Sequence, residues 1–297
     1  MLGGWLTAIT LVSLLLVTVN FAILLYACYE YGTSGKKSPW LRSTQVLSAQ
    51  ANAWPSVIML HGFGGTPKDF RALAEIVAGQ GFRVVVPAIP DQTSTSFAYS
   101  RGAISPTAYV DWLGNLIRDE TALSGLPPML VGTSMGGALA VIGAADHNVS
   151  KLVLLSPFFS LAIRDAGATR STKFLRWIVP VVPKTAKAQI SDPIGYKEYE
   201  TGSYLVSLRA FLQLAELARI ARGKAPGLAL PILVLASQND TVASYAVTER
   251  LFQGRDQVRM VAYNRGNHIL TYDFDRERVL MEVIEFLTGE PAPQGTS

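Results

Sequence analysis

PPMLVGTSMGGALAVIGA, residues Pro128 to Ala145, is the stretch that decides the fold. A short apolar strand candidate leads into Gly132-Thr133-Ser134-Met135-Gly136, and an alanine-rich helix candidate follows. This context favours a nucleophile elbow, in which a serine stands on a tight, strained turn and flanking glycines remove Cβ atoms that would collide. Ser134 is therefore a candidate nucleophile, and the N–H of Met135, at the start of the helix, is a candidate oxyanion donor. The alternative is a tight turn with no catalytic role.

A second glycine-rich loop follows another apolar run. Residues Ser56 to Leu60 (SVIML) end at His61-Gly62-Phe63-Gly64-Gly65, and a helix is predicted from Pro67 to Gly79. Such a loop after a buried strand supplies the second oxyanion donor in hydrolases with an elbow, and here that donor is the N–H of Phe63. The G-x-G-x-x-G spacing of a dinucleotide-binding loop is absent. We interpret His61 as a residue that shapes the loop rather than as a base.

Strand and helix patterns alternate along the rest of the chain. Further strands are predicted at Arg83–Pro87, Lys151–Leu155, Pro231–Ala236 and Gln257–Tyr263, and helices at Tyr109–Leu123 and Arg276–Leu287. This alternation predicts an α/β fold with a mostly parallel sheet flanked by helices, over residues 55–288. Ligands bind at the carboxyl ends of the strands in such sheets, where the glycine-rich and polar loops lie, including the polar segment Asp91 to Pro106.

Two residues could activate a serine, which needs a base that is itself oriented by a carboxylate. Asp240 follows one predicted strand and His268 follows the next, so the chain order is Ser, Asp, His. The chain has three histidines, and His147 lies at the end of the elbow helix, where we expect it at the surface. The alternative for Asp240 is a plain turn residue.

Residues of about 158–222 interrupt the alternation, and we interpret them as a helical cap insertion over the strand ends. A helix is predicted from Tyr204 to Ala221, with an apolar face made by Leu205, Leu208, Leu212, Ala215 and Ala218. The run Phe174 to Val179 is apolar with basic flanks. It could touch anionic lipid headgroups or line the underside of the cap, and we favour the lining.

The amino-terminal segment predicts a membrane anchor. Residues 1–29 hold no charged side chain, and about 20 apolar residues suffice to span a bilayer. We expect a single-pass protein of a bacterial inner membrane, with a linker at residues 30–54. Lys36, Lys37 and Arg42 favour a cytoplasmic catalytic domain. Cys28 in Leu25-Tyr26-Ala27-Cys28 suggests a lipoprotein with an external domain instead, and an uncleaved anchor with the domain outside is a third possibility.

Composition restricts the other possibilities. The formal net charge is +4, and the basic excess lies between Pro157 and Ile190. The rest of the chain is therefore near neutral, so a general nucleic-acid-binding surface is not indicated. One cysteine allows no internal disulfide and no cysteine-based metal site. The sequence contains no HExxH and no GxxxxGK[ST], and we expect no metal or organic cofactor. Residues 289–297 are rich in Pro, Gly and Gln, which predicts a disordered tail.

Four motifs together carry a family resemblance: HGFGG (61–65), GTSMGG (132–137), ASQNDTV (236–242) and GNHILTYDFDRE (266–277). With them, residues of about 55–287 resemble the α/β-hydrolase superfamily, in its bacterial carboxylesterase and monoacylglycerol lipase-like branch, with serine aminopeptidase-type relatives. The resemblance implies Ser134 as nucleophile, His268 as base and Asp240 as its orienter. It also implies Phe63 and Met135 as backbone oxyanion donors. The cap and the membrane segment depart from the family pattern.

These features predict a membrane-anchored serine hydrolase that cleaves a small-molecule acyl ester, such as a monoacylglycerol or lysophospholipid, through an acyl-enzyme intermediate. An aminopeptidase-type hydrolase is one alternative, and it would need a carboxylate near the substrate amine, for which Asp192, Glu198 and Glu200 are available. An acyltransferase could use the same triad. A silent hydrolase-fold scaffold at the membrane is the non-enzyme alternative.

Overall fold

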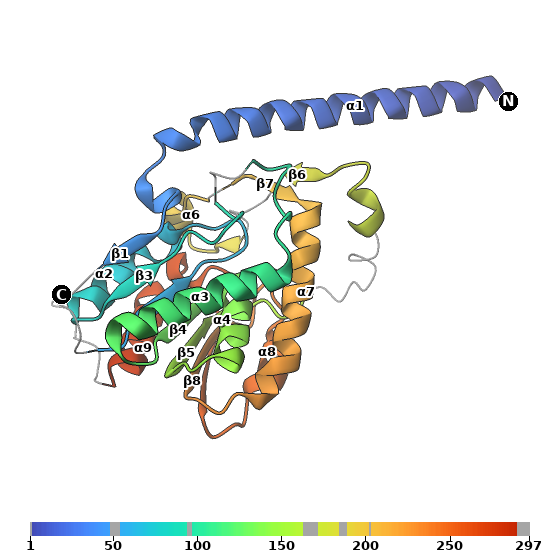
Figure 1. The fold of residues 1–297 in the computed structure, drawn as a ribbon. Helices are drawn as coiled ribbons and strands as arrows, with labels where there is room; N and C mark the ends of the chain where they lie inside the picture. Colours follow the sequence, from blue (N-terminus) through green and yellow to red (C-terminus); the bar gives the residue numbers. More distant parts are fainter. Residues whose placement is uncertain are drawn as a thin grey trace.

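The structure is a computed structural model that describes residues 2–47, 54–93, 97–162, 172–183, 189–201 and 203–289. The tail predicted over 289–297 lies outside the described residues beyond Gly289. Figure 1 shows a long amino-terminal helix, α1 (Leu2–Thr33), above a layered domain of helices and a central sheet.

The central sheet has seven strands in the order β1-β3-β2-β4-β5-β8-β9. All neighbours pair in parallel except β1 and β3, which are antiparallel. In the middle, Leu130 on β4 lies opposite Ile58 on one side and Leu152 on the other. The prediction of a mostly parallel α/β sheet is confirmed. The strands are β1 (Gln45–Leu47), β2 (Val57–Leu60), β3 (Val84–Val86), β4 (Met129–Thr133), β5 (Lys151–Leu155), β8 (Ile232–Ser237) and β9 (Val258–Tyr263).

Helices cover both faces of the sheet, because successive strand residues point to opposite sides and both sets are apolar. Alternate residues such as Val57 and Met59 pack against α2 (Arg71–Gly79) and α9 (Arg276–Thr288). Their neighbours Ile58 and Leu60 join the core under the helices of the other face. Those helices are α3 (Pro106–Ser124), α4 (Met135–Asp146), α7 (Leu208–Lys224) and α8 (Tyr245–Phe252).

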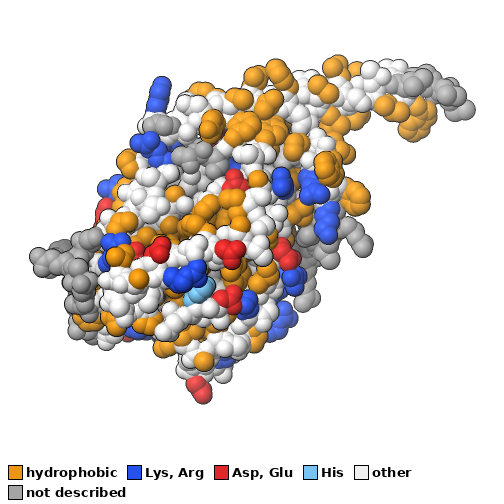
Figure 2. Space-filling view, in the orientation of Figure 1, with side chains coloured by type: hydrophobic (Ala, Val, Ile, Leu, Met, Phe, Trp, Pro, Cys, Tyr) orange, Lys and Arg blue, Asp and Glu red, His pale blue; other side chains and the backbone are white. Residues whose placement is uncertain are grey.

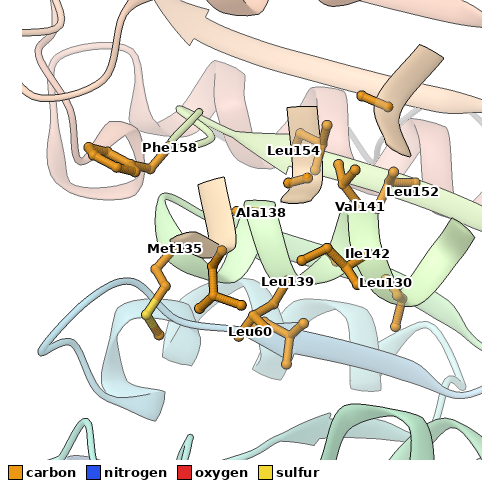
Figure 3. Packing of buried hydrophobic residues seen from close by; sticks show 14 of the residues in the cluster. Leu60, Leu130, Met135, Ala138, Leu139, Val141, Ile142, Leu152, Leu154 and Phe158 are labelled. Atoms are coloured by element: carbon orange, nitrogen blue, oxygen red, sulfur yellow. The ribbon is translucent and has the colours of Figure 1, made fainter. Parts of the chain in front are cut away.

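The helix after the elbow, α4, lies at the centre of this second face. Every residue from Met135 to Gly143 is buried, so the helix has no polar face. Figure 3 shows Leu139 and Ile142 of α4 among Leu60 and Leu130 of the strands beneath. Each fully buried aliphatic side chain contributes about 1.5–3 kcal/mol through removal of apolar surface from water. The position of the elbow is therefore fixed by a helix whose first nine residues are all buried in the core.

The structured domain begins earlier than predicted, because β1 lies within the predicted linker 30–54. Val46 of β1 pairs with Val85, and η2 (Pro39–Leu41) buries Leu41. Three half-exposed residues at a sheet edge are too short a pattern to be recognised in the sequence. The helix α1 also continues past residue 29 to Thr33, and Glu30 is buried.

The predicted cap at 158–222 divides into two parts. Its long helix begins at Leu208, and its buried residues are Ala210, Leu214, Leu217, Ala218 and Ala221, which pack with α4 in the main core. The apolar face predicted from Leu205, Leu208, Leu212 and Ala215 is therefore wrong, and α7 covers the sheet rather than the strand ends. The described remainder comprises a helical turn at 172–175, α6 (Pro193–Glu198) and an antiparallel ribbon of β6 (Val181–Pro183) and β7 (Leu205–Ser207). Residues 163–171, 184–188 and 202 of the predicted cap are outside the described part.

The run Phe174 to Val179 faces outward. Phe174 is 73% exposed and Trp177 is 79% exposed, so the favoured interpretation that this run lines the underside of the cap is wrong. Figure 2 shows hydrophobic side chains along α1 as well. Within the stretch Thr7–Thr33 of α1, an 18-residue window has a mean hydropathy of 2.5, and the stretch is long and apolar enough to cross a membrane, although signal sequences and core helices of soluble proteins share these properties.

Candidate active site

Ser134 stands at the turn between β4 and α4 with φ 52° and ψ −117°, in the positive-φ region that non-glycine residues rarely adopt. A Cβ on Gly136 would overlap the Leu60 carbonyl, and a Cβ on Gly132 would overlap the Gly136 carbonyl. The two glycines are therefore required by the close approach of β2, β4 and α4. This packing holds the strained conformation of Ser134.

Ser134, His268 and Asp240 form one chain of hydrogen-bond contacts. His268 Nε2 lies 2.9 Å from Ser134 Oγ, and His268 Nδ1 lies 2.8 Å from Asp240 Oδ2. The carboxylate favours the tautomer with its proton on Nδ1, which leaves Nε2 free to accept the serine proton. Ser134 and His268 are 8% and 4% exposed. The arrangement has the geometry needed to generate a nucleophilic oxygen.

The loop that carries Asp240 is fixed by its backbone. Asp240 Oδ1 accepts hydrogen bonds from the N–H groups of Val242 and Ala243, both at 2.8 Å. The N–H of Thr241 donates to Asn267 Oδ1 at 2.9 Å, which joins this loop to the one that carries His268. Asp240 thus meets His268 with one oxygen while the other is held in place.

Asp273 anchors the histidine loop. Its carboxylate is 1% exposed and accepts four backbone N–H bonds, from Asn267 (2.7 Å), Phe274 (2.9 Å), Ser191 (3.0 Å) and Asp192 (2.9 Å). Two donors are local, and two come from the segment ahead of α6, about 80 residues earlier in the chain. Asp273 therefore fixes the His268 loop against the cap.

The loop after β2 has the shape that the sequence predicts for an oxyanion loop. His61 is fully buried; its Nε2 accepts from the N–H of Ile89 (3.1 Å), so Nδ1 carries the proton and donates to the Gly62 carbonyl (3.0 Å). Both ring nitrogens are thus engaged by backbone groups, which agrees with a loop-shaping role. His147 ends α4 as its C-cap.

The same loop is supported from behind by Gln92, which belongs to the polar segment after β3. The N–H of Gly64 donates to Gln92 Oε1 (3.1 Å), and Gln92 Nε2 donates to the Tyr109 hydroxyl (2.8 Å). Burial raises the pKa of Tyr109 to about 12, so the hydroxyl remains protonated at physiological pH. Phe63, the candidate donor next to Gly64, lines the same pocket as Ser134.

A pocket opens at the triad, with about 380 Å³ of space between the atoms, part of which is open to solvent. Gln189 and Tyr199 of the cap close it on one side, and the carbonyl of Gln189 accepts the backbone N–H of His268 at 3.1 Å. Burial, and secondarily the charge of Asp69, raises the pKa of Tyr199 well above its ordinary value. The pocket is lined by Gly62, Phe63, Gly65, Asp69, Thr133, Ser134, Gln189, Tyr199, His268, Ile269 and Thr271.

Asp69 is a pocket carboxylate that the sequence did not identify. It occupies the N3 position of a capping box with Thr66, so its pattern indicates only a helix start. The predicted cap carboxylates are engaged elsewhere. Glu200 pairs with Lys68 (2.8 Å), Glu198 pairs with Arg276 (2.9 Å), and Asp192 caps α6. Within the described residues, no group of three or more His, Cys, Asp or Glu side chains could hold a metal ion.

The family described as serine aminopeptidase, S33, matches residues 51–275, which is most of the chain. The chain belongs to this family. The region that matches the S33 family begins after α1 and ends before α9, so α1 lies outside the matched region.

Named relatives of this S33 family member are lipid hydrolases. The thermostable monoacylglycerol lipase of Bacillus sp. (strain H-257) is 24% identical over 238 residues, covering 77% of this chain and 89% of that protein. Phospholipase YtpA of Bacillus subtilis (strain 168) is 24% identical over 211 residues, covering 67% and 80%. Both alignments place the chain in the monoacylglycerol lipase-like branch of the α/β-hydrolases.

Solved structures show the same fold. The monoacylglycerol lipase of Paleococcus ferrophilus superposes with a TM-score of 0.71 at 19% identity, covering 83% of this chain and 98% of that one. The monoglyceride lipase of Saccharomyces cerevisiae, in complex with a substrate analog, gives a TM-score of 0.71 at 16% identity, covering 84% and 91%. The α/β-hydrolase fold is therefore confirmed.

Proposed function

We propose that this protein is a membrane-anchored serine hydrolase that cleaves carboxylic esters through an acyl-enzyme intermediate. The observation that carries the proposal is the chain of contacts from Asp240 through His268 to Ser134 at the floor of a pocket. The names of the lipase and phospholipase relatives support ester bonds as the target.

In the proposed mechanism, Ser134 Oγ attacks the ester carbonyl carbon while His268 Nε2 takes the serine proton. The N–H groups of Phe63 and Met135 hold the resulting oxyanion, with the N-terminal end of α4 adding positive potential. His268 then donates the proton to the leaving alkoxide, which departs as the alcohol. Water, deprotonated by His268, attacks the acyl-enzyme and releases the acid.

The proposed substrates are monoacyl esters such as monoacylglycerols or lysophospholipids. The pocket combines Phe63 and Ile269 with the polar groups of Asp69 and Tyr199, which supports a substrate with an apolar chain and a small polar head. Apolar helix α1 supports substrates that partition into bilayers. An acyltransferase would use the same residues with an alcohol in place of water.

We further propose that α1 anchors the protein in a bacterial inner membrane, with the catalytic domain on the cytoplasmic side. Lys36, Lys37 and Arg42 after the helix support this side. Cys28 is exposed, so lipidation there after cleavage is the alternative. Intact mass of the purified protein decides between them, because the anchor retains residues 1–27 and the lipoprotein begins with a modified Cys28.

An aminopeptidase-type activity is a second candidate, and the observation that favours it is Asp69. A carboxylate beside the nucleophile could pair with a substrate ammonium group. In this reading Asp69 takes the role that the sequence suggested for the cap carboxylates. The same carboxylate would instead accept hydroxyl hydrogen bonds from a glycerol head group in the ester reading.

The decisive experiment compares glycerol monoesters of increasing acyl length with aminoacyl anilides, on the wild type and on Asp69→Asn. The ester proposal predicts turnover of long monoesters and at most a loss of substrate affinity in the variant. Turnover of anilides that Asp69→Asn abolishes would establish the aminopeptidase reading. A folded protein that turns over neither class would support the scaffold alternative.

A further inference from the structure

The carboxy-terminal part of α1 is docked on the catalytic domain rather than joined to it by a loose tether. Ala27 is 1% exposed and packs with Ala98, Val181 and Leu205, and Ile23 lies against the same cluster. Tyr31 meets the ring of Phe97 edge-on at 6.0 Å. Figure 1 shows α1 passing above β6 and β7, while its amino-terminal end projects beyond the domain.

A buried polar group fixes this docking. The carboxylate of Glu30 is 5% exposed and accepts hydrogen bonds from Ser203 Oγ (2.8 Å) and the Tyr204 N–H (2.9 Å). Arg101 Nη2 lies 3.8 Å away, and this guanidinium also donates to the Thr93 and Leu205 carbonyls. A buried carboxylate with its counter-ion is costly to separate, so the helix keeps one orientation on the domain.

The contact with the domain extends along α1 to Asn20. The Asn20 Nδ2 donates to the backbone carbonyl of Ile178 (3.1 Å), and the backbone carbonyl of Asn20 accepts a hydrogen bond from the Tyr99 hydroxyl (3.3 Å). Between Trp5 and Val17, most of the large apolar side chains that the structure describes are exposed, as for Leu14 at 62%, and Leu16 is partly exposed. Residues Leu2 to Val19 extend about 27 Å at about 1.5 Å per residue, close to the roughly 30 Å of a bilayer's hydrocarbon core.

This geometry decides where the bilayer surface can lie. If the boundary were near Glu30, where the charge-free stretch ends, the loop around Phe97 to Arg101 would lie at the depth of the hydrocarbon. Irregular backbone exposed to lipid is not tolerated, because its polar groups find no hydrogen-bond partners there. A boundary near Asn20 keeps the domain in water.

The turn from Lys173 to Ile178 lies at that same level, because Ile178 bonds to Asn20. Its exposed aromatic side chains, Phe174 and Trp177, are of the kind that gathers at membrane interfaces. Lys173 is exposed, so its ammonium group can reach lipid phosphates, and Arg176 lies over the Trp177 ring at 5.0 Å.

From these contacts we infer that α1 crosses the bilayer only with the residues ahead of Asn20, and that the Lys173–Ile178 turn inserts into the bilayer interface beside it. The partner is an anionic phospholipid surface, continuous with the lipid around α1. The inference rests on the proposed membrane anchor. The segment that follows the turn carries Gln189 and Tyr199 of the catalytic pocket, so the bilayer is held beside the cap.

The test uses the full chain with Cys28→Ser, which removes the single cysteine, and one new cysteine at a time carrying an environment-sensitive fluorophore. Phe174→Cys probes the turn, Leu14→Cys probes the crossing part of α1, and Leu123→Cys, an exposed apolar site at the end of α3, is the control. Each protein is reconstituted into vesicles of phosphatidylethanolamine and phosphatidylglycerol containing lipids with a nitroxide at a shallow or a deep acyl position.

We expect the deep nitroxide to quench the label at 14 and the shallow nitroxide to quench the label at 174. The quenching at 174 should be at least about half of that at 14, and the control label at 123 should show little quenching. Quenching at 14 together with equal values at 174 and 123 would overturn the inference and leave the anchor standing. Absence of quenching at 14 would reject the anchor itself, and the inference with it.

Two variants test the docking. Glu30→Gln removes the buried charge. Asn20→Ala removes the hydrogen bond to Ile178; it is the milder change, and it serves as the test if Glu30→Gln does not fold. We expect either folded variant to lower the quenching at 174 by about twofold or more while that at 14 is unchanged, because the crossing helix stays inserted. Unchanged quenching at 174 in folded Asn20→Ala would show that the turn does not depend on this contact.

Discussion

The imidazole of His268 lies 2.9 Å from the Ser134 hydroxyl although 134 residues separate the two in the chain. Two loops at neighbouring strand ends, after β8 and β9, bring Asp240 and His268 to the elbow. The parallel sheet thus gathers the three groups at one edge, which is where ligands bind in such folds.

Asp240→Asn tests the tautomer argument. The amide would donate to Nδ1 and favour a proton on Nε2, so Nε2 could no longer accept the serine proton; we expect kcat to fall by about 10³–10⁴-fold. Asp256→Asn, an exposed site, is the matched control. Steady-state kinetics on a monoacylglycerol measures both, and equal activity of the two variants would show that Asp240 does not orient His268.

Asp273→Asn tests the positioning of the histidine loop. The amide loses one of the two acceptor oxygens that hold four N–H groups, and we expect kcat to fall by about 10–100-fold through misplacement of His268, with KM within about threefold. Asp275→Asn is the control. A variant that only loses thermal stability and keeps kcat below its melting temperature would show a purely structural role.

Gly136→Ala tests the close approach at the elbow. The new Cβ would overlap the Leu60 carbonyl, so we expect loss of activity and a stability loss of several kcal/mol, roughly that of severe overpacking. Gly223→Ala in α7 meets nothing within 4 Å and should stabilise by about 0.5–1 kcal/mol. Urea unfolding of both variants measures the difference, and equal stabilities would contradict the packing described here.

Leu217→Ala tests whether α7 belongs to the core. Leu217 is fully buried beside α4, and we expect the free energy of unfolding to drop by about 2–5 kcal/mol. Leu212→Ala, on the half-buried side that the sequence favoured, should cost about 1 kcal/mol. A larger loss of stability in Leu212→Ala than in Leu217→Ala would show that the apolar face predicted from the sequence is the one that packs.

Asp91→Asn tests a pH effect on stability. Burial raises the pKa of Asp91, only partly offset by the Gly102 N–H and by Arg101. Because the folded state holds this proton more tightly, the associated stability is present below the ordinary pKa of about 3.9 and is lost as pH rises through the raised value. We therefore expect the wild type to lose melting temperature relative to Asp91→Asn above about pH 4. The melting temperatures of both proteins are measured from pH 3 to 7, and a difference between them that does not change with pH would contradict this prediction.

The sheet and the elbow could be predicted because their signals are local. Strands buried on both faces read as apolar runs, and Lys151–Leu155 matches β5 in both bounds. Ser134, Asp240 and His268 follow three such runs, so their convergence follows from the parallel order of the strands. What the sequence did not reveal depends on tertiary contacts.

Three examples show this limit. Asp69 reads as a capping residue, and only the fold turns its side chain into the pocket. Asp273 receives two of its four donors from a segment about 80 residues away. The buried face of α7 depends on where α4 lies, because a helix with apolar residues on several sides has no single face in its sequence.

The most direct test of the central claim is labelling by a fluorophosphonate, which reacts with an activated serine, followed by peptide mass spectrometry. Wild-type protein, Ser134→Ala and Ser156→Ala are compared; Ser156 is a buried serine at the end of the neighbouring strand. Our account predicts a phosphonylated Ser134 in the wild type and in Ser156→Ala, and no labelling in folded Ser134→Ala. Labelling that persists in Ser134→Ala, or none in the folded wild type, would contradict it.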